Sequence, residues 1–178
     1  MIMARKRLAS GTSASASSSH AKRRTGPVHL PRKFVSGGQT GVDRGGLEVA
    51  IALGIEHGGW CPRGRLAEDG SVPSRYELVE NDSTDYTVRT RQNVIDSDAT
   101  LILYEQRLSG GTMLTRCIAT ELKKPFLCVR INQGAAAEIA IWLNELKPAI
   151  LNVAGPRESS SPGIESRAFE ILIGVFTS

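Results

Sequence analysis

The residues of this chain best suited to chemistry form a glycine-rich stretch, SGGQTG, that runs from Ser36 to Gly41. An apolar pair, Phe34 and Val35, precedes it, and a segment with helical periodicity follows it. Glycines let a backbone approach a ligand closely, and the N-terminus of a following helix presents N–H groups and the positive end of its dipole. The stretch therefore indicates an anion site, most commonly for phosphate. A tight strand-to-helix turn without a ligand is the alternative.

The spacing of this stretch differs from that of two familiar phosphate-binding loops. A P-loop needs Lys followed by Ser or Thr directly after its last glycine, whereas Gly41 is followed by Val42 and Asp43. The spacing GxGxxG is absent as well. Asp43 falls in the first turn of the predicted helix, where the dipole favours a carboxylate. It has either a structural role or a hydrogen bond to an amine or hydroxyl of a ligand.

Two further polar stretches follow apolar runs and precede helical patterns: SGGT at 109–112 and AGPRESSSPG at 154–163. With the first stretch they offer backbone N–H groups and four hydroxyl groups to an anion. Three arginines either add charge-assisted contacts or are surface charges and ion pairs. The hydroxyl groups are those of Ser36, Thr40, Ser109 and Thr112, and the arginines are Arg89, Arg91 and Arg157.

A long segment rich in Gly and Pro, residues 56–76, is predicted to be a structured loop, and long loops in compact domains are often functional. Trp60 within it either anchors the loop in the core or stacks on a flat ring. His57 and Cys61 are four residues apart, but no second Cys/His pair completes a zinc site, so we predict no bound metal. Three widely spaced cysteines favour free thiols in a reducing compartment.

Strand-like and helix-like patterns alternate along the rest of the chain. The apolar runs at 99–105, 126–131 and 149–155 are typical of buried parallel strands, and helical patterns lie between them. This alternation, without hairpin turns, predicts an α/β fold: a Rossmann-like, doubly wound parallel sheet with helices on both faces. Ligands of such sheets bind beyond the C-terminal ends of the strands, where all three glycine-containing stretches fall.

Caps and periodicity predict the boundaries and buried faces of the helices. We expect one helix to open at Asp82 or Ser83, one at about Thr112, and the last at Ser161 as N-cap with Pro162 in its first position. The predicted buried faces are Leu47, Ala50, Ile51 and Ile55; Tyr86, Thr90, Asn93 and Val94; Ile139, Trp142, Leu143 and Leu146; and Ile164, Ala168, Ile171, Leu172 and Val175.

The composition predicts one domain after a basic extension. The 178 residues, 40% of them hydrophobic, suffice for one sizeable core, and no apolar run reaches the 18 residues of a membrane span. Residues 1–32 are rich in Ser, Ala and Arg, so we predict a disordered extension before a domain at 33–178. Residues 1–33 hold eight of the 22 basic residues and no acid, so the remainder is slightly acidic.

The extension itself has three interpretations. It is an organelle transit peptide, a basic arm that touches nucleic acid, or a solvated or misassigned extension without a role. We expect a cytoplasmic protein, with an organelle as the alternative if the segment is a transit peptide.

Several motifs in order resemble the molybdenum cofactor (Moco) carrier protein family: GGQTGVDR, HGGWCPRGRLAEDG, YTVRTRQNVIDSD, SGGT, and LNVAGPRES followed by PGI. The resemblance runs from Phe34 to about Phe176. It implies a Rossmann-like protein that binds and protects the molybdenum cofactor (molybdopterin) without turnover. It also implies a homo-oligomer, a dimer or a tetramer, and handover of the cargo to molybdoenzymes. This cofactor is a molybdenum-bearing pterin with a terminal phosphate, so loops that bind anions suit both of its ends.

The same family is distantly similar to the lysine-decarboxylase-like (LOG) phosphoribohydrolases, whose second loop reads PGGxGTxxE with a catalytic Glu. Here that loop reads SGGTMLTR, with Thr115 and Arg116 where the Glu is needed and Glu121 too far along the helix. We therefore expect a carrier without catalytic residues. The alternative is a nucleotide- or nucleotide-sugar-binding protein or hydrolase, and a nucleic-acid adaptor that uses the basic arm is the third hypothesis.

The loops and the resemblance together predict one cofactor site, which phosphate, molybdate or a nucleotide would also occupy. Glu68 and Asp69 either contact the amino group of the pterin or face water, and Cys61 either ligates molybdenum or is packed. The predicted cofactor-binding residues are Ser36, Gly37, Gly38, Gln39, Thr40, Gly41, Asp43, Trp60, Arg89, Asn93, Ser109, Gly110, Gly111, Thr112, Gly155, Arg157, Glu158 and Ser159.

Overall fold

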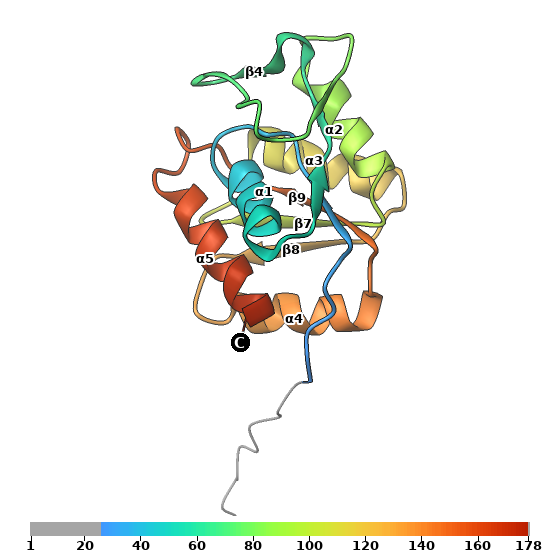
Figure 1. Cartoon of the computed structure of the whole chain (residues 1–178), viewed down its shortest axis with the longest axis vertical. Coiled ribbons are helices and arrows are strands. Elements are labelled where there is room, and N and C mark those ends of the chain that lie inside the picture. Colours follow the sequence, from blue (N-terminus) through green and yellow to red (C-terminus); the bar gives the residue numbers. More distant parts are fainter. Residues whose placement is uncertain (1–25, 178) are drawn as a thin grey trace, which may run out of the picture.

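Five parallel strands form the central sheet of this protein, whose computed structural model describes residues 26–177 (Figure 1). The strand order is β2-β1-β9-β7-β8, so the last strand is inserted between the first and the seventh. The strands are β1 (Lys33–Val35), β2 (Glu56–Gly58), β7 (Ala99–Tyr104), β8 (Phe126–Arg130) and β9 (Ile150–Ala154). The predicted Rossmann-like sheet is confirmed.

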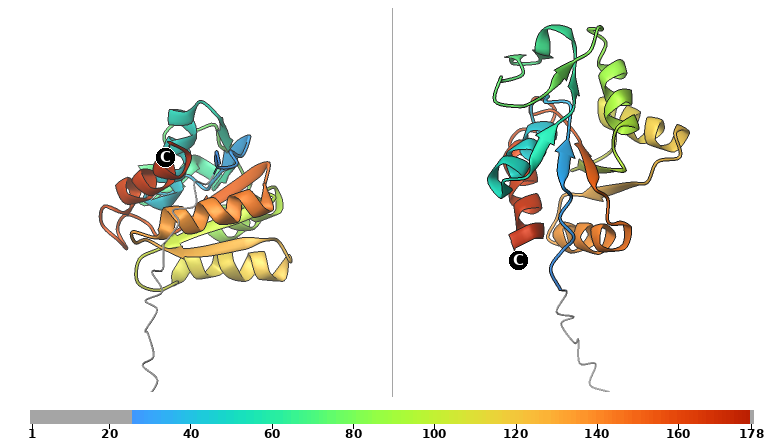
Figure 2. Two further views of the ribbon diagram at one scale, coloured as in Figure 1. Left: turned by 90° about the horizontal axis from the view of Figure 1, so that it is seen from below. Right: turned by 45° about the vertical axis from the view of Figure 1, so that its right-hand side comes forward.

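Helices cover both faces of this sheet (Figure 2). On one face, α1 (Val42–Leu53), α4 (Ala135–Leu146) and α5 (Ile164–Thr177) pack on the main core. On the other face lie α2 (Tyr86–Ile95) and α3 (Gly110–Glu121), around a smaller apolar cluster. Because successive strand residues point to opposite faces, the nearly continuous apolar sequence of β7 serves both layers.

Residues 59–85 leave the sheet as an excursion that stands above α1 and beside α2 (Figure 1). It contains a parallel pair, β3 (Trp60–Cys61) with β6 (Val79–Glu80), and an antiparallel pair, β4 (Leu66–Ala67) with β5 (Gly70–Ser71). Leu47 of α1 completes a separate apolar cluster inside it. The predicted long loop is therefore an ordered unit with its own small core.

Arg65 organises this excursion. Its guanidinium donates to four backbone carbonyls, each at 3.0 Å: those of Val72, Pro73, Tyr76 and Leu78. Buried carbonyls must be paired, and one cation here replaces the strand pairing that the segment lacks.

The strand order brings the three glycine-containing loops together. β9 pairs with β1 on one side and with β7 on the other, so the loops that follow these three strands lie next to one another at the C-terminal edge. The backbone N–H of Val42 donates to the carbonyl of Pro156 at 3.2 Å. Gly41 has a φ of 84°, and a side chain there would overlap the backbone of residues 156–158. The first and third loops are therefore in direct backbone contact.

Three predicted helix starts differ from the structure. α2 begins after Asp85, whose carboxylate accepts the N–H of Thr87 at 2.8 Å, and not at Asp82 or Ser83. α5 begins at Ile164 and not at Pro162. α3 begins at Gly110, two residues before the predicted start.

The predicted buried faces are confirmed in most positions. Six residues differ, and one of them, Ile55, follows the end of α1 and is only partly buried. Of the five within helices, Ile51 and Leu146 are exposed, at 41% and 38%, whereas Tyr86, Trp142 and Ile171 are only partly buried. Each lies at the border of its apolar stripe, where the helix turns away from the sheet.

Residues 28 and 29, just before the predicted boundary at residue 33, contact the folded domain. Val28 packs against the main core, and the backbone N–H of His29 donates to Oδ1 of Asn144 in α4 at 2.7 Å. Residues 1–25 of the predicted extension lie outside the described residues. In the described part of the chain, none of the helices is both long and apolar enough to cross a bilayer.

The tight crossing of α1 and α5 yields a stability test. A Cβ at Gly45 would lie 2.8 Å from the carbonyl oxygen of Glu165, whereas a Cβ at Gly174 in α5 would meet nothing within 4 Å. Gly45→Ala should lower the free energy of unfolding by about 1–3 kcal/mol although alanine favours helices, because the helices must move apart. Gly174→Ala should raise it by up to about 1 kcal/mol. Urea denaturation of both variants checks this, and equal effects would contradict the packing described.

Candidate functional site

A cleft of about 330 Å³ opens at the C-terminal edge of the sheet, between the loops after β1, β7 and β9 and the starts of α2 and α3. Residues from all three glycine-containing loops line it, as the sheet order requires. Ten predicted site residues line this cleft: Gln39, Asp43, Arg89, Ser109, Gly110, Gly111, Thr112, Gly155, Arg157 and Ser159.

The N-terminus of α3 forms one wall of the cleft. Ser109 is its N-cap but makes no side-chain capping bond. Within residues 26–177, the N–H groups of Gly110 and Gly111 have no hydrogen-bond acceptor. A side chain added at Gly111 would meet open space. This wall therefore offers unpaired donors and the positive end of a helix dipole to an anion.

Two arginines and a tyrosine form the opposite wall. Arg89 lies on α2, and Arg157 lies on the loop after β9. Both guanidinium groups lie over the ring of Tyr86, at 5.9 and 4.9 Å from its centroid. Among the described residues that line the cleft, Asp43 is the single acidic residue and Arg89 and Arg157 are basic, so positive charges outnumber negative ones. The cleft as a whole attracts an oxyanion.

The first glycine loop supports the cleft in a different way from that predicted. Its N–H groups are largely paired inside the protein: Thr40 donates to Oε1 of Gln39 at 3.1 Å, and Gly41 donates to Oε2 of Glu165 at 3.2 Å. The missing side chain at Gly37 makes room for the guanidinium of Arg89 rather than for a ligand. The free donors are thus at α3.

Asp43 and Arg89 form an ion pair in the wall of the cleft. Nη1 of Arg89 lies 3.1 Å from Oδ2 of Asp43, which also faces the N–H of Gln39 at 3.4 Å. Burial raises the pKa of Asp43, and the charge of Arg89 and the backbone hydrogen bonds offset this only in part. Nε2 of Gln39 and Nε of Arg89 are buried donors without an acceptor in the part of the chain described. A bound oxyanion or an ordered water would pair them.

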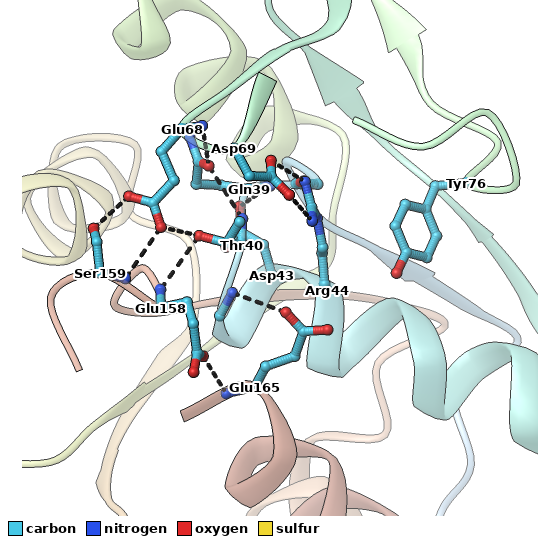
Figure 3. Close-up of polar contacts among 12 residues, drawn as sticks. Gln39, Thr40, Asp43, Arg44, Glu68, Asp69, Tyr76, Glu158, Ser159 and Glu165 are labelled. Atoms are coloured by element: carbon cyan, nitrogen blue, oxygen red, sulfur yellow. Dashed lines mark hydrogen bonds and ion pairs between the residues drawn. The ribbon is translucent and has the colours of Figure 1, made fainter. Parts of the chain in front are cut away.

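Glu68 ties the excursion to two of the loops (Figure 3). Its carboxylate accepts hydrogen bonds from the hydroxyls of Thr40 and Ser159 and from the N–H of Ser159 at 3.1 Å. Desolvation opposes ionisation, but these bonds and the charge of Arg157 outweigh it and lower the pKa of Glu68. Glu68 is exposed, as its solvated alternative required, but its carboxylate also clamps these loops, a role that was not predicted.

A second contact between the excursion and α1 lies beside Glu68. Arg44 pairs with both carboxylate oxygens of Asp69, at 2.6 and 2.8 Å, and its Nε donates to the carbonyl of Gly38 at 3.1 Å (Figure 3). Asp69 is therefore a partner of α1, and its hydrogen bonds with Arg44 lower the pKa of its carboxyl group.

An acidic depression of about 480 Å³ lies next to the cationic cleft, and four carboxylates line it with Thr40 and Ser159. Negative charge disfavours an anion there. Glu158, predicted to bind the cofactor, instead caps the start of α5, because its carboxylate accepts the N–H groups of Gly163 and Glu165. The four acids are Glu68, Asp69, Glu158 and Glu165.

Trp60 and Asn93 are not brought to the cleft. The amide of Asn93 is used by the backbone of Trp60, with bonds of 2.8 and 3.1 Å to its N–H and carbonyl. The indole N–H of Trp60 donates to Asp96 at 2.7 Å. Trp60 therefore joins β3 to α2 by hydrogen bonds, and it lies outside the lining of the cleft and outside the core clusters of the described residues.

The remaining predicted residues lie beneath the cleft. The hydroxyl of Ser36 is buried and donates to the carbonyl of Val153 at 2.8 Å. Gly38 has a φ of 70° and packs against Val72 and Leu78 of the excursion. These residues shape the loop without facing the cleft.

Sequence reasoning also missed contributors. The helical periodicity places Tyr86 and Thr90 only on a buried helix face, yet both line the cleft. The signal was available for Tyr86, because Arg89 follows three residues later on the same helix face. Arg91 forms an ion pair with Glu121, at 2.6 and 3.0 Å, which is the second of the two roles expected for it.

In residues 26–177 no group of three His, Cys, Asp or Glu side chains could hold a metal ion, and Cys61 is buried in the small core.

The Glu68 clamp can be tested by its removal. Glu68→Gln should speed amide hydrogen exchange at Ser159, which loses a charged acceptor. Because Glu68 is exposed, global stability should fall by less than about 1 kcal/mol. Because the pKa of Glu68 is lowered in the folded protein, its carboxylate stabilises the fold at pH values above the ordinary Glu pKa of 4.5. The difference in stability between the wild type and Glu68→Gln should therefore vanish as the pH falls through the pKa of Glu68 in the folded protein. Glu138→Gln on α4 is the control, and unchanged exchange at Ser159 would exclude the clamp.

The comparisons with known proteins agree with this geometry. The chain is similar to a crystal structure described as "putative molybdenum carrier protein" from Syntrophus aciditrophicus SB, with 42% identity and a TM-score of 0.80. The match covers 85% of this chain and 97% of that one. The curated proteins contain no match. The model of the circularly permutated YpsA SLOG family matches residues 34–176. The chain therefore belongs to the circularly permutated YpsA SLOG family, which confirms the resemblance inferred from its motifs.

Proposed function

We propose that this protein binds and carries the molybdenum cofactor in the cleft, without turnover. One observation carries the proposal: unpaired N–H groups at the start of α3 face the same cleft as Arg89 and Arg157. Such a set of donors recognises the oxygens of a phosphate or molybdate group. The similar protein from Syntrophus, described as a molybdenum carrier, supports the choice of cargo.

The chemistry of the cleft matches the cargo in two respects. Gly110 and Gly111 supply neutral donors, and Arg157 supplies a charged donor, to a terminal phosphate. Tyr86 offers an aromatic face to a flat pterin ring, where Arg157 now lies over it at 4.9 Å. The buried, unpaired donors of Gln39 and Arg89 also fit a ligand rich in oxygen atoms.

A nucleotide-binding protein or hydrolase is the second candidate, and Asp43 is the observation that favours it. In a circularly permutated family the order of motifs along the chain differs from that of its relatives, so the Glu missing from the second loop is weaker evidence against hydrolysis. Asp43 is a buried acid with a raised pKa in the cleft wall, and such a group suits general acid–base catalysis.

Isolation of the native protein separates these two functions. Gly111→Asp places a carboxylate at the anion wall in open space, and an acid in the first turn of a helix is itself stabilising. Gly111→Asn has the same shape without the charge. Molybdenum and pterin should co-purify anaerobically with the wild type and with Gly111→Asn but be lost from Gly111→Asp, as metal analysis and mass spectrometry measure. A nucleotide in place of pterin would overturn the carrier proposal.

Arg157 provides a second test that uses purified protein. The side chain is exposed, so Arg157→Gln should leave stability within about 0.5 kcal/mol of the wild type. Loss of one charge-assisted hydrogen bond should weaken binding of inorganic phosphate about tenfold. Arg116→Gln, an exposed arginine of α3 outside the lining, should bind phosphate like the wild type. Equal phosphate affinity in all three proteins, measured by calorimetry, would remove Arg157 from the site.

Other properties inferred from the resemblance are part of this proposal. They are self-association into a dimer or tetramer, transfer of the cargo to molybdoenzymes, and a cytoplasmic location. The exposed apolar side chains of Val88 and Ile141, at 45% and 54%, are available to protein partners.

A further inference from the structure

The ion pair of Asp43 and Arg89 places a buried carboxylate in the wall of a cleft that is expected to bind an anion. Asp43 is only 4% exposed, and Arg89 partly neutralises it at 3.1 Å. Both side chains line the cleft, so a bound oxyanion would lie beside a buried carboxylate. Two negative groups in contact in a site of low dielectric oppose each other's ionisation, which favours a proton on one of them.

Arg89 cannot fully serve both anions. Its Nη1 contacts Asp43, while its Nε has no acceptor in the described part of the chain. An oxyanion that contacts this guanidinium competes with Asp43 for its charge, and the carboxylate that loses its counter-ion is buried. Under these conditions a carboxyl group takes up a proton.

The other charged groups near Asp43 do not replace Arg89. Arg44, the next residue of α1, is paired with Asp69 at 2.6 and 2.8 Å. From α5, Glu165 accepts the N–H of Gly41 and adds no positive charge. The loop after β9 presents Arg157, which lies over Tyr86.

We propose that the cleft takes up its oxyanion together with one proton, which is shared between the Asp43 carboxyl group and an oxygen of the ligand. This inference rests on the proposed function and names the form of ligand that the site selects. A phosphate monoester, whose second pKa is about 6, brings this proton with it below about pH 6, and above that pH the proton must come from solvent. Sulfate brings none, so the proton must come from solvent. The raised pKa of free Asp43 is in keeping with the same tendency.

The pH dependence of sulfate binding tests this inference, because sulfate does not titrate between about pH 5 and 9. In the wild type, sulfate affinity should fall about tenfold per pH unit above the pKa of Asp43. Asp43→Asn should abolish this slope and bind sulfate more tightly at the alkaline end. Glu121→Gln breaks a comparable but exposed ion pair with Arg91 outside the cleft and should keep the wild-type slope.

A second measurement does not depend on the folding of the variant. Calorimetric titration of the wild type with sulfate, in two buffers of different ionisation enthalpy, reports the protons taken up, and we expect about one per sulfate in the alkaline range. Sulfate binding with no proton uptake and no pH slope would overturn this inference and leave the anion site intact. If neither sulfate nor phosphate bound to the wild type or to Asp43→Asn, the proposed function itself would be overturned.

Discussion

The site depends on the direct backbone contact between the loops after β1 and β9. At Gly41 the two loops are too close for any side chain, and the N–H of Val42 reaches across to the carbonyl of Pro156. This contact fixes where α1 and α5 begin and holds Arg157 opposite the start of α3. The parallel order β1-β9-β7 makes it possible, because it puts three loops from distant parts of the sequence at adjacent strand ends.

The same edge of the sheet carries two surfaces of opposite charge. Arg89, Arg157 and the dipole of α3 dominate the cleft, whereas four carboxylates dominate the depression beside it. Ser159 lines both, and Glu68 holds the boundary by hydrogen bonds to Thr40 and Ser159. An oxyanion near this boundary is thus driven to one side, which gives the site an orientation before any contact with the rest of a ligand is made.

The sequence predicts the fold well because its strands and helices have strong, separate periodicities. It predicts part of the site, since the glycine loops necessarily meet at one edge of the sheet. It does not predict which donors stay free: Gly111 and Gly41 look equivalent in sequence, yet Gly41 donates to a glutamate 124 residues away. Trp60 and Asn93 were misplaced for a related reason, because their mutual hydrogen bonds join segments that sequence spacing does not connect. Side-chain pairing over long separations is the information that a single sequence lacks.

The guanidinium of Arg65, bonded to four carbonyls, has a mechanical consequence for the excursion. Because one cation donates to all four carbonyls, fraying of the segment from Val72 to Leu78 would have to break several hydrogen bonds of Arg65 together. Two polar contacts, Arg44 with Asp69 and Glu68 with Ser159, join the excursion to the edge of the sheet, and its small apolar core joins it to Leu47 of α1. Any opening above the site would therefore have to break these polar contacts and also expose the apolar cluster around Leu47.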